Sequence, residues 1–259
     1  MTPEFGTSRT AIVTGGARRI GEAFVRALAA DGWSVLIHCH ESREAADALA
    51  ADLPGARVVQ ADLAAPDCGE RIVAALEGMP SPGLLINSAS RFELDQFDDF
   101  TLDGWERHFL PNLRGPALLT RAFAARVPEG ARALVVNMLD AKLAQPNPDF
   151  FTYTLSKYGL AALTELSARV LAPRHIRVCG IAPSVTLVSG KQTRDNFEDV
   201  HRLNALGRGV EVADLVAALR FLVASPHVTG EVIRVDAGQR FLGLSRDVQF
   251  LQDHENDDR

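Results

Sequence analysis

The chain has 259 residues, of which 47% are hydrophobic and 23% are charged, and its formal net charge is −6. These values fit one large globular domain with a substantial core, and the acidic balance argues against a nucleic-acid partner, which would need a basic face. The apolar runs at 159–163 and 176–182 are too short to cross a bilayer, and the N-terminus lacks a signal pattern. We therefore expect a cytoplasmic protein with no membrane partner.

Short β-rich runs alternate with amphipathic segments of helix length along most of the chain. Residues 1–9 show no periodicity and are expected to form a flexible leader. We expect strands at 11–14, 34–38, 57–60, 84–87, 133–137, 177–181 and 232–235, and helices that include 20–31, 43–52, 153–171 and 212–223. The polar stretch 184–199 follows a strand, the position of an active-site lid. Residues 245–259 form a polar C-terminal tail, whose end at 252–259 is expected to be disordered.

The order of these elements predicts a single α/β domain over residues 10–244. Proline and glycine fall between the predicted elements, as at 53–55, 79–83 and 127–130. Strands that are apolar on both faces and alternate with helices form a parallel sheet with right-handed crossovers. The sequence therefore predicts a doubly wound parallel sheet with helices on both faces.

The segment Thr14-Gly15-Gly16-Ala17-Arg18-Arg19-Ile20-Gly21 joins the first predicted strand to the first predicted helix. Amide groups at the N-terminus of that helix face the space above the turn, and the helix dipole favours an anion there. A glycine-rich turn is often no more than a turn. Its position between a strand and a helix favours the pyrophosphate of a dinucleotide.

Tyr153 and Lys157 lie one helical turn apart, far downstream of this segment. The spacing places both side chains on one helix face, where the ammonium group favours the ionised form of the phenol. By itself the spacing also fits an ordinary half-exposed helix. Together with the glycine-rich turn, it predicts hydride chemistry on a nicotinamide cofactor.

These motifs resemble, in the same order, those of the short-chain dehydrogenase/reductase family. TGGARRIG is similar to the family's cofactor turn, and specifically to the arginine-bearing version of pteridine reductases and dihydropteridine (dihydromonapterin) reductases. The resemblance continues through 87–90, Asn112, Asp140, Tyr153, Lys157 and 235–238, and so covers nearly the whole chain. It implies a Rossmann-type sheet with strand order 3-2-1-4-5-6-7 and a homotetramer, and the small residues in the helices at 153–171 and 212–223 suit close packing between subunits.

The end of the second strand indicates which dinucleotide binds. An acidic residue there would bond the ribose hydroxyls and repel a 2′-phosphate. This chain has His38-Cys39-His40-Glu41-Ser42-Arg43, and Arg18 can point to the same place. We expect NADPH, as in the pteridine reductases that the segment resembles, although Glu41 stands where those proteins often carry a basic residue.

Two features near this strand have simpler interpretations. His38 and His40 fit solvated loop histidines, and the three cysteines lack a CxxC spacing, so we expect no metal site. Asp62 resembles the adenine-contacting aspartate of the family, but it is also suited to cap a turn.

In the family that the chain resembles, Tyr153 would give the proton, and Lys157 would lower its pKa and bond the nicotinamide ribose. Asn112 would support a water-linked proton path. Thirteen residues before Tyr153, most members of the family carry a serine, whereas this chain has Asp140. A carboxyl group bonds the N–H and amino edge of a pterin, while an ionised carboxylate repels a developing alkoxide. A helix-capping aspartate is the alternative.

Two more residues point to the same substrate. Phe92 aligns with the aromatic residue that stacks on the pterin in pteridine reductases, with core packing as the alternative. Arg19 matches the arginine that faces pteridine and pyrophosphate, with a surface ion pair as the alternative. Ser90 replaces a glycine of the commoner motif, and Ala182-Pro183-Ser184-Val185 stands where most of the family has Pro-Gly.

We therefore predict an NADPH-dependent reductase of a pterin-like substrate, with Asn112, Asp140, Tyr153 and Lys157 as catalytic residues. Substrate binding falls to Arg19, Ser90, Phe92, Asp140 and Tyr153. The alternatives are a carbonyl reductase acting on a ketone or 3-oxoacyl group, and a non-catalytic dinucleotide sensor, against which the retained catalytic set argues. The predicted cofactor-binding positions are Gly15, Arg18, Arg19, Ile20, Gly21, His38, His40, Ser42, Asp62, Leu63, Asn87, Ser88, Ala89, Ser90, Asn112, Tyr153, Lys157, Pro183, Ser184 and Val185.

Overall fold

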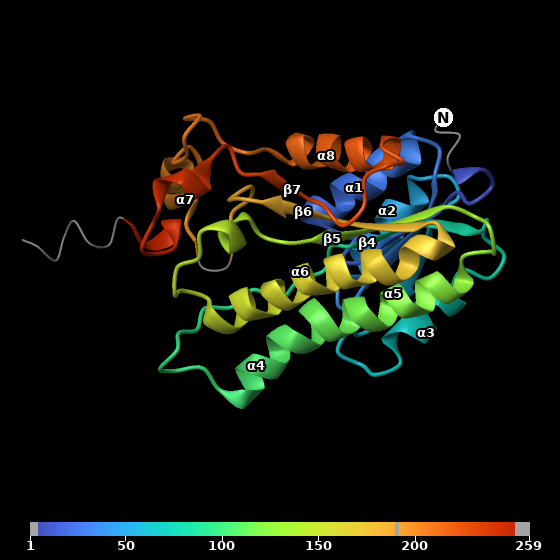
Figure 1. Ribbon diagram of the computed structural model, residues 1–259, viewed down its shortest axis with the longest axis horizontal. Coiled ribbons are helices and arrows are strands. Elements are labelled where there is room, and N and C mark those ends of the chain that lie inside the picture. The colour runs from blue at the N-terminus through green and yellow to red at the C-terminus, as the bar shows by residue number, and fades with distance from the viewer. Residues whose placement is uncertain (1–4, 190–191, 252–259) are drawn as a thin grey trace, which may run out of the picture.

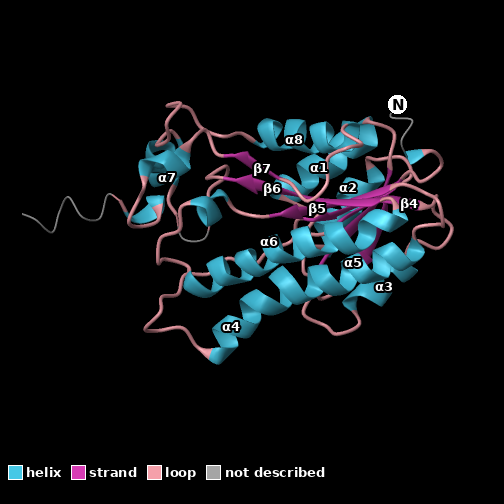
Figure 2. Cartoon of the chain, in the orientation of Figure 1, coloured by secondary structure: helices cyan, strands magenta, loops and turns pink. Residues whose placement is uncertain are grey.

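Seven parallel strands form one sheet in the order β3-β2-β1-β4-β5-β6-β7, which confirms the predicted fold and strand order (Figures 1 and 2). The computed structural model describes residues 5–189 and 192–251. Each predicted strand is present, with ends that differ by at most a few residues. The strands are β1 (Thr10–Val13), β2 (Ser34–Cys39), β3 (Arg57–Gln60), β4 (Pro82–Asn87), β5 (Ala133–Met138), β6 (Ile176–Pro183) and β7 (Val232–Val235).

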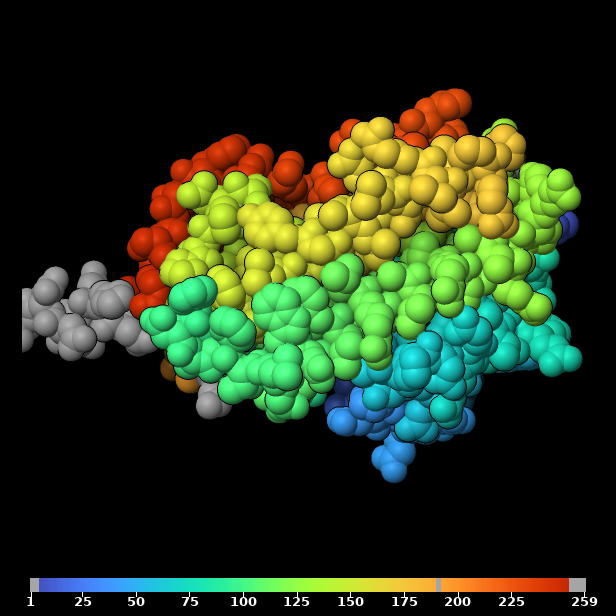
Figure 3. Space-filling model, turned by 60° about the horizontal axis from the view of Figure 1, so that its bottom comes forward, coloured from blue at the N-terminus to red at the C-terminus, as the bar shows by residue number. Residues whose placement is uncertain are grey.

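Helices cover both faces of the sheet, as Figure 1 shows. One face carries α1 (Arg19–Ala30), α2 (Arg43–Ala51) and α8 (Val212–Ala224), and the other carries α3 (Cys68–Ala74), α4 (Leu102–Phe109), α5 (Gly115–Arg126) and α6 (Phe151–Leu171). Seen from the second face, α4 and α5 in green run beside α6 in yellow (Figure 3). No helix within the described residues combines the length and apolarity that a membrane span requires.

The strands send alternate side chains into two separate cores. In β1, Ala11 and Val13 join the core under α1 and α8, whereas Ile12 points into the core under α3 and α5. β5 follows the same rule, with Leu134 on the first side and Val135 on the second. Each of these side chains is fully buried, and each valine, leucine or isoleucine among them contributes about 1.5–3 kcal/mol. Two-sided burial of this kind holds the carboxyl ends of the strands at one edge.

The structure corrects two predictions about irregular segments and adds detail to a third segment. Residues 5–9 are not a loose leader, because the Phe5 ring is 2% exposed and packs edge-on against Trp33 at 5.1 Å. The second half of the predicted lid is helical, as α7 (Arg194–His201). The tail is ordered as far as residue 251 and carries a 3-10 turn, Val248–Phe250. The predicted disorder at 252–259, and the first four residues of the predicted leader, fall outside the described residues.

Candidate active site

A cavity of about 590 Å³ opens at the carboxyl edge of the sheet, beside the glycine-rich turn. It brings together most of the predicted site residues, from α1, α6, the end of β6 and the loops that follow β1, β4 and β5, and leaves seven outside its lining. Those that line it are Gly15, Arg18, Arg19, Ile20, Gly21, Ser88, Ala89, Ser90, Phe92, Asp140, Tyr153, Lys157, Pro183, Ser184 and Val185. Those outside are His38, His40, Ser42, Asp62, Leu63, Asn87 and Asn112.

The glycine-rich turn packs so tightly that two positions admit no side chain. A Cβ at Gly21 would lie 2.1 Å from the Gly15 carbonyl oxygen, and one at Gly15 would meet Ala89 at 3.0 Å. Arg19 begins α1 with φ of 57°, a left-handed conformation that non-glycine residues rarely adopt. Because no side chain caps α1, its first amide groups stay available for an anion.

Arg18 and Arg19 flank this turn as exposed cations. Within the described residues, neither forms an ion pair, so the structure does not support the surface ion pair considered for Arg19. Two guanidinium groups beside an uncapped helix N-terminus suit a ligand with several phosphate oxygens.

His38 does not lie in a solvated loop, and the structure corrects that interpretation. Its ring is 1% exposed inside β2, because His38 is the fifth residue of a six-residue buried strand. Nδ1 accepts the Gly15 N–H at 3.3 Å, and Nε2 lies 3.0 Å from the Ala61 carbonyl oxygen. His38 therefore supports the glycine-rich turn from beneath and has no nitrogen left for a cofactor.

The other predicted residues at this end lie around the cavity without lining it. His40 is exposed beyond β2, and Asp62 accepts the Ala64 N–H at 2.8 Å, which is the turn cap considered as its alternative role. Leu63 is buried beneath this turn. The side-chain amide of Asn87 donates to Asn137 Oδ1 at 2.8 Å, and this hydrogen bond links β4 to β5.

Asp140 and Tyr153 meet at the centre of the site. The Tyr153 hydroxyl donates to Asp140 Oδ2 at 2.8 Å, while Asp140 Oδ1 accepts the Lys142 N–H at 2.8 Å. Asp140 follows β5 and caps the short turn Ala141–Ala144, so its carboxylate orientation is fixed from both sides. The capping role and the tyrosine contact thus coexist in one residue.

The charges around Tyr153 differ from the prediction. Burial, followed by the Asp140 carboxylate, raises the pKa of Tyr153 well above its usual value, whereas the sequence predicted a lowering by Lys157. Lys157 Nζ donates to the Met138 carbonyl oxygen at 2.7 Å and lies 5.6 Å from the centre of the Tyr153 ring. Burial lowers the pKa of Lys157 to about 8. Tyr153 is therefore a phenol that holds its proton.

Asn112 lies beside the site in a π-helical turn, Leu110–Arg114, that joins α4 to α5. Pro111 lacks an N–H, which favours this departure from α-helical bonding. The Asn112 side chain is fully buried, accepts the Arg91 N–H at 2.7 Å and donates to Ser156 Oγ at 3.1 Å. In this arrangement it fastens the loop after β4.

Phe92 presents a half-buried ring to the cavity. It stacks on Phe150 with ring centres 4.1 Å apart and meets Tyr153 edge-on at 4.7 Å. Both the predicted packing role and exposure to a ligand are therefore present at this residue.

Sequence reasoning missed the residues that the C-terminal strap, residues 245–251, brings to the cavity. Arg246 donates to both carboxylate oxygens of Asp149, at 3.0 and 2.9 Å, and Asp149 Oδ2 also accepts the Asp247 N–H at 2.7 Å. Asp247 and Val248 then line the cavity, with Asp247 Oδ2 3.7 Å from Lys142 Nζ. The acidic composition of the tail does not indicate these contacts, since Asp149 lies 98 residues from Asp247 in the sequence.

The sequence and the fold of the chain are similar to those of known proteins. The profile of a family described as "Enoyl-(Acyl carrier protein) reductase" matches residues 15–240. The chain belongs to the short-chain dehydrogenase/reductase family. Among solved structures, FolM alternative dihydrofolate reductase 1 from Brucella canis, in complex with NADP, has a TM-score of 0.88 and 37% identity, and covers 92% of this chain and 96% of its own.

Two curated proteins are similar to this chain over nearly their whole length. Pteridine reductase 1 from Leishmania tarentolae is 29% identical over 90% of this chain and 96% of its own. The 3-oxoacyl-[acyl-carrier-protein] reductase of Synechocystis is 28% identical over 90% of this chain and 97% of its own.

The burial of His38 predicts a pH-dependent stability. Burial lowers the pKa of His38 from 6.5 to about 4. Between pH 6.5 and pH 4, His38 is therefore protonated in the unfolded reductase and neutral in the folded one. The free energy of unfolding then falls as the pH falls through this window. Relative to His38→Gln, the native protein should lose about 2 kcal/mol between pH 7 and pH 5 in urea unfolding.

His40→Gln is the matched control, because His40 is exposed one residue beyond the strand. The pH dependence of its difference from the native protein should be much smaller than that of His38→Gln. A His38→Gln difference that does not change with pH would contradict the buried, neutral imidazole.

Proposed function

We propose that this chain is an NADPH-dependent reductase that transfers a hydride to a pterin-like, pteridine or dihydropteridine, substrate. The hydrogen bond from Tyr153 to Asp140 carries the proposal. A phenol that keeps its proton is an acid, and the carboxylate beside it suits a substrate with ring N–H and amino donors.

The cradle beside the glycine-rich turn fits NADPH. The uncapped start of α1 and the exposed Arg18 and Arg19 suit the pyrophosphate and a 2′-phosphate, and the Brucella canis structure at 37% identity holds NADP. Lys157 and Pro183 to Val185 also line the cavity and would hold the nicotinamide ribose and ring. When bound, NADPH supplies the hydride.

The residues of the chain supply the proton. Reduction of a C=N bond adds a hydride to carbon and a proton to nitrogen. Tyr153 would deliver that proton from Oη, and the pair that it forms with Asp140 would take one proton back from solvent after the step. The Lys142 N–H holds Asp140 in place, and burial of the phenol keeps the proton on Oη until substrate arrives.

The aromatic and cationic residues of the lining support a flat heterocycle. Phe150 covers one face of Phe92, and Phe92 lines the cavity, so a pterin ring would stack on its free face. Arg19 and Ser90 line the same cavity and offer a donor and a hydroxyl to the ring edge.

Reduction of a ketone or 3-oxoacyl group is the second candidate, because relatives of that activity are about as similar as the pteridine reductase, with 28% and 29% identity. The Asp140 carboxylate argues against it. An alkoxide that develops beside an ionised carboxylate is repelled, whereas a hydroxyl at that position would stabilise it.

We also infer a homotetramer. The outer surface of α6 exposes Leu166 and Val170, at 62% and 73%, and α8 exposes Phe221 at 50%. Apolar side chains gathered on helices in this way mark surfaces that association covers.

The substrate proposal is tested by NADPH oxidation with biopterin, dihydrobiopterin, dihydromonapterin and dihydrofolate, beside simple diketones. The native chain should oxidise NADPH with at least one pterin. Asp140→Ser should lower pterin turnover by about a hundredfold or more and raise diketone turnover. Reaction with diketones alone, or pterin turnover that survives Asp140→Ser, would contradict the proposal.

The assembly is tested by light scattering of the native chain, which should give four times the subunit mass. Val170→Asp places a charge on the exposed surface of α6 and should lower the mass without unfolding the protein. A native chain with the mass of one subunit would refute the tetramer.

A further inference from the structure

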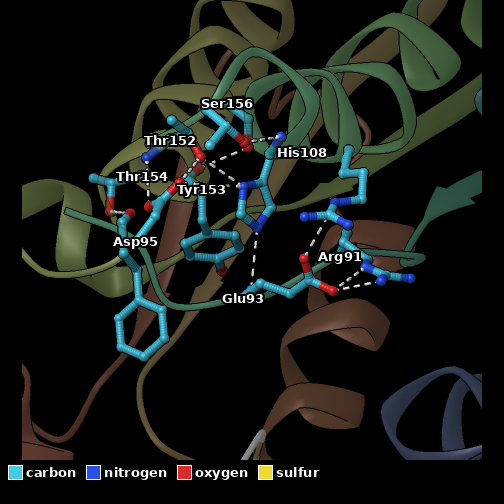
Figure 4. A network of polar contacts seen from close by, with 12 residues as sticks. Arg91, Glu93, Asp95, His108, Thr152, Tyr153, Thr154 and Ser156 are labelled. Carbon is cyan, nitrogen blue, oxygen red and sulfur yellow. Dashed lines mark hydrogen bonds and ion pairs between the residues drawn. The ribbon is translucent and has the colours of Figure 1, made fainter. Parts of the chain in front are cut away.

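A buried set of polar contacts fastens the loop between β4 and α4 to the start of α6. We define this loop frame by Glu93, Asp95, His108 and Thr152, which Figure 4 shows converging beside Tyr153. His108 and Thr152 are 1% and 0% exposed, and the Asp95 side chain is 13% exposed. None of the four takes part in the proton transfer described above.

The first contact of the loop frame is a helix cap supplied from the loop. α6 follows Phe150, which adopts φ of 56° and has no side-chain cap bond. Asp95 supplies the missing acceptors, since its carbonyl oxygen takes the Phe151 N–H at 3.2 Å and its Oδ1 takes the Thr152 N–H at 3.0 Å. A carboxylate at a helix N-terminus also gains from the helix dipole. The start of α6 is thus fixed by a residue of the loop.

The second contact has a defined direction. The Glu93 N–H donates to His108 Nε2 at 3.1 Å, so that nitrogen carries no proton and the neutral ring holds its hydrogen on Nδ1. Nδ1 then donates to Thr152 Oγ1 at 2.7 Å, and the Thr152 hydroxyl donates to Asp95 Oδ2. Burial lowers the pKa of His108, which agrees with a neutral ring. Thr152 is the junction, because its hydroxyl accepts from His108 and donates to Asp95.

The loop frame acts on two residues of the active site at once. Phe92 lies between two residues whose backbones are held by hydrogen bonds. Asn112 bonds both the N–H and the carbonyl oxygen of Arg91, and His108 accepts the Glu93 N–H. Tyr153 directly follows Thr152 in α6. The Phe92 ring meets the Tyr153 ring edge-on at 4.7 Å, so displacement of the loop or of the helix start separates them.

We propose that the loop frame is a positioning device, with Thr152 at its centre, that holds the Phe92 ring and the Tyr153 hydroxyl in one fixed relation. Breaking the frame should lower kcat, because Tyr153 Oη shifts from Asp140, and should raise KM, because the Phe92 platform shifts. Binding of NADPH should not change, since the glycine-rich turn lies outside the frame and Lys157 is held separately, by the Met138 carbonyl oxygen. The identity of the substrate and the role of Tyr153 as proton donor rest on the proposed function.

The test compares three single variants in α6. Thr152→Val keeps the shape of the side chain and removes both hydrogen bonds of the hydroxyl, and Thr152→Ser restores the hydroxyl. Thr154→Val is the matched control: Thr154 is also buried, and its hydroxyl bonds the Phe150 carbonyl oxygen at 2.8 Å within the helix, outside the frame. For each variant, kcat, KM, NADPH affinity and the midpoint of thermal unfolding are measured.

Thr152→Val should lower kcat on the order of tenfold to a hundredfold and raise KM, with unchanged NADPH affinity. Thr152→Ser and Thr154→Val should stay within about twofold of the native chain. Equal kcat and KM in Thr152→Val and Thr154→Val would overturn the proposal, as would a loss in Thr152→Val that serine fails to restore.

A second variant covers the case in which Thr152→Val does not fold. Asp95→Asn keeps an oxygen for the Thr152 N–H and removes the carboxylate that accepts the hydroxyl, so it should show the same loss of kcat in a folded protein. Unchanged kcat in Asp95→Asn would refute the frame. The measurements use whichever substrate the native chain reduces. If the native chain reduces only diketones, the pterin proposal is wrong, and the loop-frame proposal is still tested with a diketone.

Discussion

The proposed active site depends on one hydrogen bond, from the Tyr153 hydroxyl to Asp140 Oδ2 at 2.8 Å, which is formed by a buried phenol. Burial and the neighbouring carboxylate both oppose ionisation of the tyrosine, so the pair stores a proton on Oη. The fold supplies the two partners from separate elements, since Asp140 follows β5 and Tyr153 lies in the first turn of α6. Their meeting therefore requires that the end of β5 and the start of α6 are both fixed.

Each of those two positions is secured by long-range polar contacts. Asp140 is held by the Lys142 N–H, and Lys142 in turn lies against the C-terminal strap through Asp247 at 3.7 Å. The start of α6 is capped by Asp95, and Lys157, one turn further, donates to the end of β5 at Met138. The chemistry sits where a rigid parallel sheet ends and loops from distant parts of the chain converge. This is the edge at which a doubly wound sheet binds its ligands.

Much of this arrangement is readable from the sequence, because it follows from local periodicity and from motifs with fixed spacing. The glycine-rich turn and the placement of Asp140 thirteen residues before Tyr153 fall in this class, whereas the strand order was expected from the resemblance to a known family. The burial of His38 and the packing of Phe5 on Trp33 do not, since neither residue carries a pattern that reports its distant partner. The same holds for the strap, whose Asp247 meets Asp149 across 98 residues, and for the Asp95 cap, 57 residues from Thr152. The pKa of Tyr153 was predicted in the wrong direction because spacing identifies the lysine on the same helix but does not report the burial of the phenol, which is the larger cause of the shift.

The stored proton on Tyr153 is accessible to one spectroscopic measurement, because the chain has only two tyrosines, Tyr153 and Tyr158. In a Tyr158→Phe variant, the ultraviolet absorbance of the phenolate reports Tyr153 alone, while circular dichroism confirms that the protein stays folded. The phenol should remain protonated through pH 10, its ordinary pKa, and adding Asp140→Asn should move its ionisation to lower pH. Ionisation of Tyr153 well below pH 10 in the folded protein, unmoved by Asp140→Asn, would contradict the tyrosine and aspartate pair as the acid of this enzyme.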